Sequence, residues 1–290
     1  FLGPGFDPMV VGDPSVENYR IPGLSLPDDL TRNRLQERRA LLSFLDRRAG
    51  HDHDHPAVEA MEGHTQKAFS LLSSRRTRDA FDLGKESPSM RERYGLPDRT
   101  DRSTGARAFG GLPHLGQCLL LTRRLIESGI PLVTVCSGRR RDSAWDGHRR
   151  HFPILRQSLL PYFDRGFSTF LEDMEDRGLL DETLVVAMGE FGRTPRIGQR
   201  TLSVIDMPAG RDHWAHCYTI LMAGGGIRGG SVYGASDEHA GYPKDKPVTP
   251  EDVAATIYHA LGVAPETRIT DPFGQPHAVA LGKPILDIFG

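Results

Sequence analysis

The chain has 290 residues, 38% of them hydrophobic and 26% charged, a composition typical of a globular protein rather than of a disordered or membrane chain. Its 36 Lys and Arg residues against 38 Asp and Glu residues give a formal net charge of −2, which does not favour a nucleic-acid binder. No apolar run approaches the roughly 18 residues that a membrane span requires, and no export signal is visible. We expect one domain over residues 1–290.

Residues 1–109 are polar and irregular, and we expect them to form a mostly helical N-terminal part. Leucines at helical spacing predict a helix over residues 30–48, and further helices are predicted over about 57–74 and 77–83. A stretch rich in Pro, Gly, Ser and charged residues, 87–105, indicates a long surface connection.

Three histidines alternate with aspartates between the first two predicted helices: His51, His53 and His55. In an extended segment this alternation places the imidazoles on one side, where they could hold a metal ion. The segment is so polar and so close to a helix end that an exposed loop is the favoured interpretation.

From residue 110 onwards, helical stretches alternate with short apolar runs, and we expect residues 110–290 to form an α/β core. Apolar runs bounded by Gly, Pro or Ser are typical of strands buried on both faces. The predicted elements are a helix at 115–128, a strand at 130–136, a helix at 153–177, strands at 183–188 and 218–223, and a helix at 251–261.

This alternation of strands and helices predicts an α/β fold with a mostly parallel sheet flanked by helices on both faces. In folds of that class, ligands bind just beyond the carboxyl ends of the strands. Polar residues near the predicted strand ends are therefore the candidates for a functional site.

Five carboxylate and imidazole side chains lie next to the predicted strand ends: Asp146, His148, Glu190, Asp212 and His213. If they converge on one edge of the sheet, their mutual repulsion and desolvation require a cation among them. A divalent metal ion would meet that requirement, and mixed histidine and carboxylate ligands suit zinc or manganese better than calcium. The alternative is that each Asp-His pair is a solvated, hydrogen-bonded pair on a loop.

Two arginines accompany these segments, Arg193 and Arg211. A guanidinium offers a planar fork that matches two oxygens of a phosphate, sulfate or carboxylate. Beside a metal ion, either arginine could hold an oxyanion substrate. A structural ion pair with Glu190 or Asp212 is an equally good interpretation.

The common nucleophile and phosphate-loop signatures are missing from the sequence. It contains no GxSxG elbow, no P-loop, no HExxH and no Rossmann glycine pattern after a strand. Thr194 is the hydroxyl nearest to the candidate residues along the chain, but nothing in the pattern favours it as a nucleophile.

Several long segments, in this order along the chain, resemble the DUF1501 family. The resemblance is strong from about residue 110 to the end and loose before it. The segments that carry it are 179–195, which contains Gly-Glu-Phe-Gly-Arg-Thr-Pro, and 210–214, 223–230, 232–237 and 250–262.

That family resembles the sulfatases and alkaline phosphatases in fold, and the resemblance implies an alkaline phosphatase-like sheet. It implies that Glu190 acts as a strand-end metal carboxylate and that Asp146 and His148 form an upstream pair of metal ligands. Asp212 and His213 would correspond to a late metal ligand or a residue that contacts the substrate.

The resemblance also implies that the first strand of the fold, with a metal aspartate and the nucleophile, lies upstream of Phe1. We therefore expect this chain to lack that N-terminal strand. Proteins of the family often carry a twin-arginine export signal, so an exported or periplasmic location is expected.

Two functions follow as expectations. The first is a metal-dependent hydrolase of small anionic phosphate or sulfate esters, with zinc, manganese or calcium as the divalent ion. The second is a non-catalytic, exported binding or scaffold protein of the same fold, because a fold does not determine a function. The oligomeric state is left open.

Overall fold

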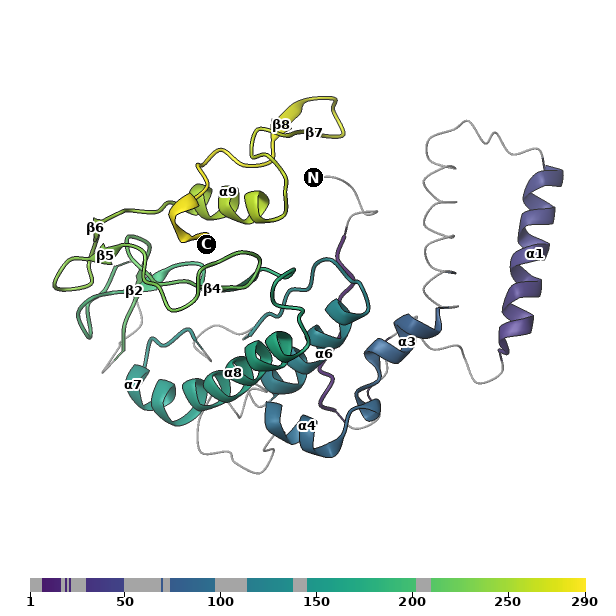
Figure 1. Cartoon of the computed structure of the whole chain (residues 1–290), viewed down its shortest axis with the longest axis horizontal. Helices are drawn as coiled ribbons and strands as arrows, with labels where there is room; N and C mark the ends of the chain where they lie inside the picture. The colour runs from purple at the N-terminus through teal and green to yellow at the C-terminus, as the bar shows by residue number, and fades with distance from the viewer. Residues whose placement is uncertain are drawn as a thin grey trace.

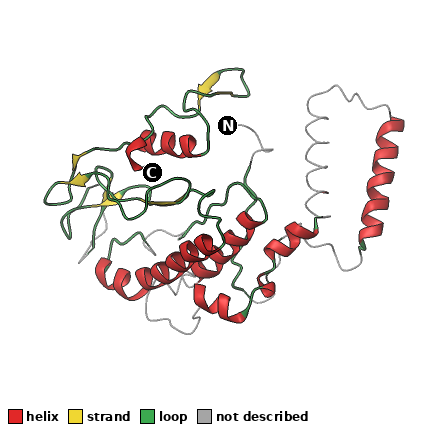
Figure 2. Ribbon diagram, viewed as in Figure 1, coloured by secondary structure: helices red, strands yellow, loops and turns green. Residues whose placement is uncertain are grey.

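The computed structural model describes residues 7–16, 19, 21, 30–49, 69, 74–96, 114–137, 145–201 and 210–290. A group of helices forms one side of the molecule, and short strands and long loops lie against it (Figures 1 and 2). Helix α1 (Arg32–Ala49) stands apart from this body, and helix α9 (Pro250–Ala260) lies on the far side of the strands from the helical group (Figure 1).

The helical group consists of α3 (Arg75–Phe81), α4 (Pro88–Tyr94), α6 (Leu115–Glu127) and α8 (Leu160–Asp176), with α6 and α8 packed side by side (Figure 1). Apolar residues at helical spacing on these elements form the core, in which Leu120 and Met174 are fully buried. The Ser87 hydroxyl caps α4 by accepting a hydrogen bond from the backbone N–H of Met90.

A glycine on α6 lets the helices of this group approach closely. A Cβ at Gly116 would lie 1.9 Å from the carbonyl oxygen of Tyr94, at the end of α4. Such a contact is far inside van der Waals distance, so α4 and α6 meet at this spacing because residue 116 has no side chain.

A buried guanidinium connects the helices. Arg123 on α6 is 1% exposed and contacts carboxylates at 2.9 Å from Glu86, 2.9 Å from Asp173 on α8 and 2.8 Å from Glu127. The Tyr94 hydroxyl donates to the same oxygen of Asp173 at 2.9 Å. Glu86 directly follows the short helix η2 (Leu83–Lys85), so one side chain links three parts of the helical group.

This network predicts a loss of stability in acid. Burial opposes ionisation of Asp173, but hydrogen bonds from Arg177 and Tyr94 outweigh it, so the pKa lies below the ordinary 3.8. The Glu86 pKa also lies below its ordinary 4.5, because hydrogen bonds from Arg124 and Arg123 outweigh its burial. A lowered folded-state pKa stabilises the protein above the unfolded-state value, and that stabilisation is lost as the pH falls through the folded-state value.

Urea unfolding at a series of pH values should therefore show the free energy of unfolding falling below about pH 4.5. Asp173→Asn cannot ionise at that position and should show a shallower pH dependence than the unchanged protein. If the free energy of unfolding depends on pH equally in the two proteins, Asp173 does not contribute to the loss of stability in acid.

Within the described residues, the strands form four separate two-stranded antiparallel sheets. The pairs are β1 (Val185–Ala187) with β4 (Leu221–Ala223), β2 (Gly192–Arg193) with β3 (His213–Trp214), β5 (Ala235–Ser236) with β6 (Pro243–Asp245), and β7 (Arg268–Thr270) with β8 (Pro276–Ala278). In the first pair, Val186 lies opposite Met222.

The predicted mostly parallel, alkaline phosphatase-like sheet with helices on both faces is wrong, because the described strands are short and pair antiparallel. Two apolar runs do contain strands, at β1 and β4, but these two strands pair directly with opposite directions. The run at 130–136 forms no strand, and Leu132 within it is 78% exposed. An apolar run predicts burial, but only a hydrogen-bonded neighbour makes a strand, and no described strand pairs with this segment.

The helix predictions agree better with the structure. Residues 30–48 correspond to α1, 115–128 to α6 and 251–261 to α9. The prediction at 57–74 and the His51–His55 loop lie almost entirely outside the described residues. The predicted helix at 77–83 begins earlier, as α3.

The long helix predicted at 153–177 is helical throughout but interrupted. It begins as α7 (His151–Ile154), passes through one π-helical turn, η4 (Leu155–Leu159), and continues as α8. Pro161 has no N–H to donate and its ring crowds the preceding turn, which accounts for the wider turn just before it. None of the helices in the described ranges combines the length and apolar composition needed to cross a bilayer.

Candidate metal centre

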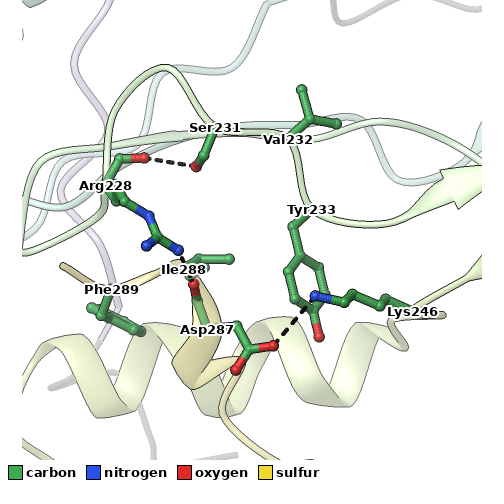
Figure 3. A pocket seen from close by; sticks show the side chains of 8 residues that line it. All are labelled: Arg228, Ser231, Val232, Tyr233, Lys246, Asp287, Ile288 and Phe289. Carbon is green, nitrogen blue, oxygen red and sulfur yellow. Dashed lines mark hydrogen bonds and ion pairs between the residues drawn. The ribbon is translucent and has the colours of Figure 1, made fainter.

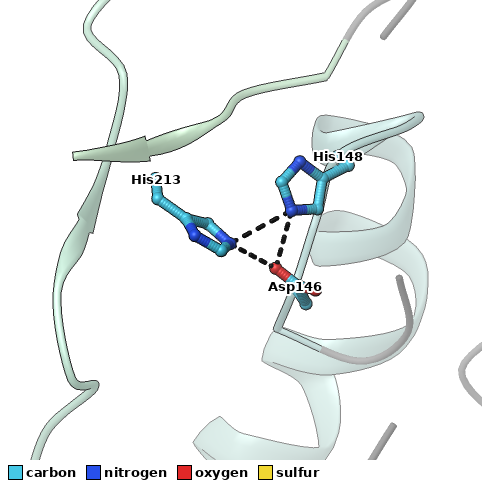
Figure 4. A group of neighbouring side chains, drawn as sticks. All are labelled: Asp146, His148 and His213. Atoms are coloured by element: carbon cyan, nitrogen blue, oxygen red, sulfur yellow. Dashed lines mark hydrogen bonds and ion pairs between the residues drawn. The ribbon is translucent and has the colours of Figure 1, made fainter. Parts of the chain in front are cut away.

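Three side chains from two distant segments of the chain meet at one point: Asp146 and His148 from one turn, and His213 from β3 (Figure 4). His148 Nε2 lies 3.0 Å from Asp146 Oδ1, His213 Nε2 lies 3.1 Å from the same oxygen, and the two Nε2 atoms are 3.1 Å apart. His148 is buried, Asp146 is partly buried and His213 is exposed, so the cluster opens to solvent on one side.

The turn that carries Asp146 and His148 is held by local bonds. The N–H of Gly147 donates to the Trp145 carbonyl, and the N–H of His148 donates to the Asp146 carbonyl, both at 2.9 Å. These tight turns direct the side chains of Asp146 and His148 towards His213 (Figure 4). The Trp145 ring packs edge-on against Phe163 of α8, which attaches the turn to the helical group.

The β2–β3 pair brings His213 to this turn. His213 lies opposite Arg193 in the register of the pair. Arg193 Nη2 donates to the Trp145 carbonyl at 3.1 Å and to Asp146 Oδ1 at 2.8 Å. The backbone N–H of Arg211 donates to the Gly147 carbonyl at 3.3 Å. The cluster therefore depends on contacts between segments about 50 to 65 residues apart in sequence.

The spacing of the three atoms matches that of metal ligands. Neighbouring ligands of an ion bound at about 2.1 Å are separated by about 3.0 Å in octahedral and about 3.4 Å in tetrahedral coordination. The separations of 3.0, 3.1 and 3.1 Å fall at the octahedral end of that range. The residues therefore fit a divalent ion held by two imidazoles and one carboxylate.

The backbone at Gly210 packs closely against the backbone of His148. A Cβ at Gly210 would lie 1.7 Å from the carbonyl oxygen of His148 and 2.2 Å from its carbonyl carbon. A side chain at position 210 would have to push apart the two segments that carry the histidines, because backbone atoms cannot rotate away as a flexible side chain can.

Gly210→Ala is therefore expected to destabilise the protein by about 1–3 kcal/mol or more and to separate His213 from His148. Urea unfolding measures the loss. Gly229→Ala is the matched control, because a Cβ there would meet nothing within 4 Å. Equal stability of the two variants would show that the segments at 148 and 210 do not meet as described.

Two arginines beside the cluster carry buried donors without partners among the described residues. Arg193 Nη1 and Arg211 Nε are buried and make no hydrogen bond to any residue that the structure describes. The guanidinium carbon of Arg193 lies 5.9 Å from the centre of the Phe191 ring, and that of Arg211 lies 5.2 Å from the centre of the Phe152 ring. An unpaired buried donor is costly, so these positions suit an acceptor that arrives with a ligand.

His151 at the start of α7 lies in the same neighbourhood and was not predicted. Its pKa lies below the ordinary 6.5 because of burial and of the nearby positive charges of Arg211 and Arg193. A Cβ at Gly147 would lie 2.3 Å from His151 Nδ1, so the ring lies against the turn that carries the cluster. Its nearness in sequence to His148 is the only sequence signal that could have identified it.

Asp212 lies behind the cluster rather than within the group of three ligand atoms. Its buried carboxylate accepts hydrogen bonds from Thr201 and from the N–H of His213, and His148 Nδ1 is 3.6 Å from its Oδ1. Thr194, also buried, accepts from the backbone N–H of Asp212 at 3.1 Å. Both residues therefore support the strand that presents His213.

Glu190 is not brought into the group. It is exposed, in the bend after β1, and its carboxylate is not among the clustered ligand atoms. Two neighbours of Glu190 contact the cluster instead. Arg193 donates to Asp146, and the centre of the Phe191 ring lies 4.5 Å from that of the His213 ring.

A protein-family model described as "Protein of unknown function (DUF1501)" matches residues 1–289. The chain belongs to the DUF1501 family. No curated protein and no solved structure matches it significantly. The match confirms the family resemblance, whereas the further resemblance to alkaline phosphatases and sulfatases finds no support in the comparisons or in the sheets.

This DUF1501 chain has a hollow of about 430 Å³ near its C-terminus (Figure 3). Arg228 Nη2 donates to the Asp287 carbonyl at 2.6 Å, and Lys246 Nζ lies 3.5 Å from the Asp287 carboxylate and 4.7 Å from the centre of the Tyr233 ring. Since Asp287 contacts both cations, we interpret the hollow as the junction that attaches the last turn, η5 (Leu286–Ile288), to the loop after β4.

Proposed function

We propose that this protein is a divalent-metal-dependent hydrolase of small phosphate or sulfate esters. The observation that carries the proposal is the triangle of ligand atoms from Asp146, His148 and His213, with edges of 3.0 to 3.1 Å. Three protein ligands that leave further coordination positions open are typical of catalytic rather than structural metal sites.

The donor atoms favour zinc or manganese over calcium. Two of the three are imidazole nitrogens, whereas calcium prefers six to eight oxygen ligands. The exposed side of His213 leaves a path by which water and a substrate reach the cluster.

The two arginines favour an anionic substrate. Arg193 Nη1 and Arg211 Nε are buried donors that an incoming oxyanion would satisfy. Guanidinium groups bind phosphate and sulfate oxygens through parallel hydrogen bonds. The low pKa of His151 leaves that ring uncharged near neutral pH, so His151 adds no cation to the two arginines.

A bound divalent ion would supply Lewis acidity, which polarises the ester oxygen and lowers the pKa of an attacking water. The side chains would hold the ion and orient the substrate. Asp146, His148 and His213 would hold the ion, Arg193 would fix the Asp146 carboxylate at 2.8 Å, and Arg211 would orient the oxyanion. The Phe191 ring, packed on His213, would shield one side of the site from water.

The test combines metal binding with hydrolysis. The protein is titrated with zinc and manganese by calorimetry and assayed on chromogenic phosphate and sulfate esters, with and without each metal. We expect binding of a divalent ion and metal-dependent release of the chromophore. Arg211→Ala should raise KM at least about tenfold without changing metal affinity, because the described contacts of the Arg211 side chain do not include the three ligands. Arg228→Ala, at the hollow near the C-terminus, is its control.

One observation favours the alternative, a non-catalytic and exported binding or scaffold protein. Asp146 already pairs with Arg193 at 2.8 Å, so the cluster could persist as a hydrogen-bonded network without an ion. If zinc and manganese neither bind at micromolar concentration nor support hydrolysis, the hydrolase proposal is refuted and the scaffold remains.

A further inference from the structure

The buried carboxylate of Asp212 is surrounded by donors on three sides. Its Oδ2 accepts from the Thr201 N–H at 2.7 Å and from the Thr201 hydroxyl at 2.8 Å. Its Oδ1 accepts from the His213 N–H at 2.9 Å and lies 3.6 Å from His148 Nδ1. At 1% exposure, the group is out of contact with water, so its oxygens need these hydrogen-bond partners.

The two ring nitrogens of His148 therefore face different partners. Nε2 faces Asp146 and His213 at 3.0 and 3.1 Å, whereas Nδ1 faces Asp212. These nitrogens point to different sides of an imidazole, so a carboxylate that faces Nδ1 does not reach an ion held at Nε2. Asp212 thus contacts the side of the His148 ring that faces away from the proposed metal position.

We propose that Asp212 is a positioning residue that holds His148 with its proton on Nδ1 and its Nε2 lone pair directed at the metal position; this rests on the metal site of the proposed function. A lone pair on Nδ1 would face a buried anion and be repelled, whereas an N–H would be attracted. Carboxylates that orient metal-bound histidines in this way also raise the basicity of the ligand.

The same residue positions the second histidine through the backbone. Asp212 directly precedes His213 in the chain, and its Oδ1 accepts the His213 N–H. Thr194, which directly follows β2, accepts a hydrogen bond from the Asp212 N–H, so Asp212 is attached to the β2–β3 pair at both strands. One side chain thereby aligns two of the three proposed ligands.

Three readouts separate positioning from simple structural support. The first is the dissociation constant for Zn²⁺, measured by competition with a chromophoric chelator. The second is the visible spectrum of the Co²⁺-loaded protein, which reports ligand geometry. The third is the ¹⁵N NMR signature of the His148 tautomer in metal-free protein, which needs no ion. Asp212→Asn is compared with Asp237→Asn, another carboxylate that accepts several backbone N–H groups, in a loop.

We expect Asp212→Asn to weaken Zn²⁺ binding by about 10–100-fold, to change the Co²⁺ spectrum and to shift His148 away from the Nδ1–H tautomer. Asp237→Asn should leave all three unchanged. If Asp212→Asn does not fold, Thr201→Val removes one bond to the same carboxylate and should act in the same direction with a smaller effect.

The outcomes distinguish this inference from the proposed function. If the protein without substitutions binds no metal, the metal site is refuted. The tautomer measurement then still decides whether Asp212 determines which ring nitrogen of His148 carries the proton. If the protein without substitutions binds Zn²⁺, and the Asp212→Asn variant has the same Zn²⁺ affinity and the same His148 tautomer, only the positioning role is refuted.

Discussion

His213→Ala is expected to weaken divalent-ion binding by more than about 100-fold. Substitutions of residues that only hydrogen-bond to a metal ligand typically cause a smaller loss. The variant removes one of three ligand atoms and leaves only His148 Nε2 and Asp146 Oδ1 in place. Hydrolysis of chromogenic esters should fall in parallel. Calorimetric titration with zinc measures the affinity, and the ester assay measures the activity.

His213 is the best of the three ligands to remove, because its side chain is 46% exposed and its loss should leave the core intact. His239→Ala is the matched control, since that imidazole is also exposed and is not among the clustered ligand atoms. Equal zinc affinity in His213→Ala and the unchanged protein would exclude His213 as a ligand, provided urea unfolding shows that both are folded.

Arg123→Met is expected to lower the free energy of unfolding by about 3–5 kcal/mol, because removing one partner of a buried ion pair leaves the others uncompensated. Asp173 is 3% exposed and Glu86 12% exposed, and both carboxylates would lose their contact with the Arg123 guanidinium. Methionine keeps much of the volume, so the change tests the charge more than the packing. Urea unfolding at pH 7 measures the effect.

Arg93→Met provides the comparison. Arg93 on α4 pairs with Glu172 on α8 at 2.7 Å, but both side chains are well exposed. Exposed ion pairs contribute about 0–1 kcal/mol, so this variant should lose little. Equal losses in the two variants would mean that burial does not set the strength of the Arg123 network.

Part of the site was predictable from the sequence. Asp146 and His148 lie two residues apart in one turn, and His213 lies in the segment Gly-Arg-Asp-His-Trp, so each has a local signal of a polar group in a glycine-flanked loop. The same signal was present at Asp212 and Glu190, so it did not distinguish the clustered residues from the others. Asp212 and Glu190 carry carboxylates as Asp146 does, but only the tertiary structure places Asp212 beside His148 Nδ1 and leaves Glu190 exposed.

The helices were determined by the sequence itself, because helical bonds and caps are local. The leucines of α6 repeat at helical spacing, and Thr249 with Asp252 forms a capping box at the start of α9. The direction of the strands was decided only in the tertiary structure. The apolar runs at β1 and β4 look alike in a parallel and an antiparallel sheet, since their pairing depends on hydrogen bonds between residues more than 30 positions apart.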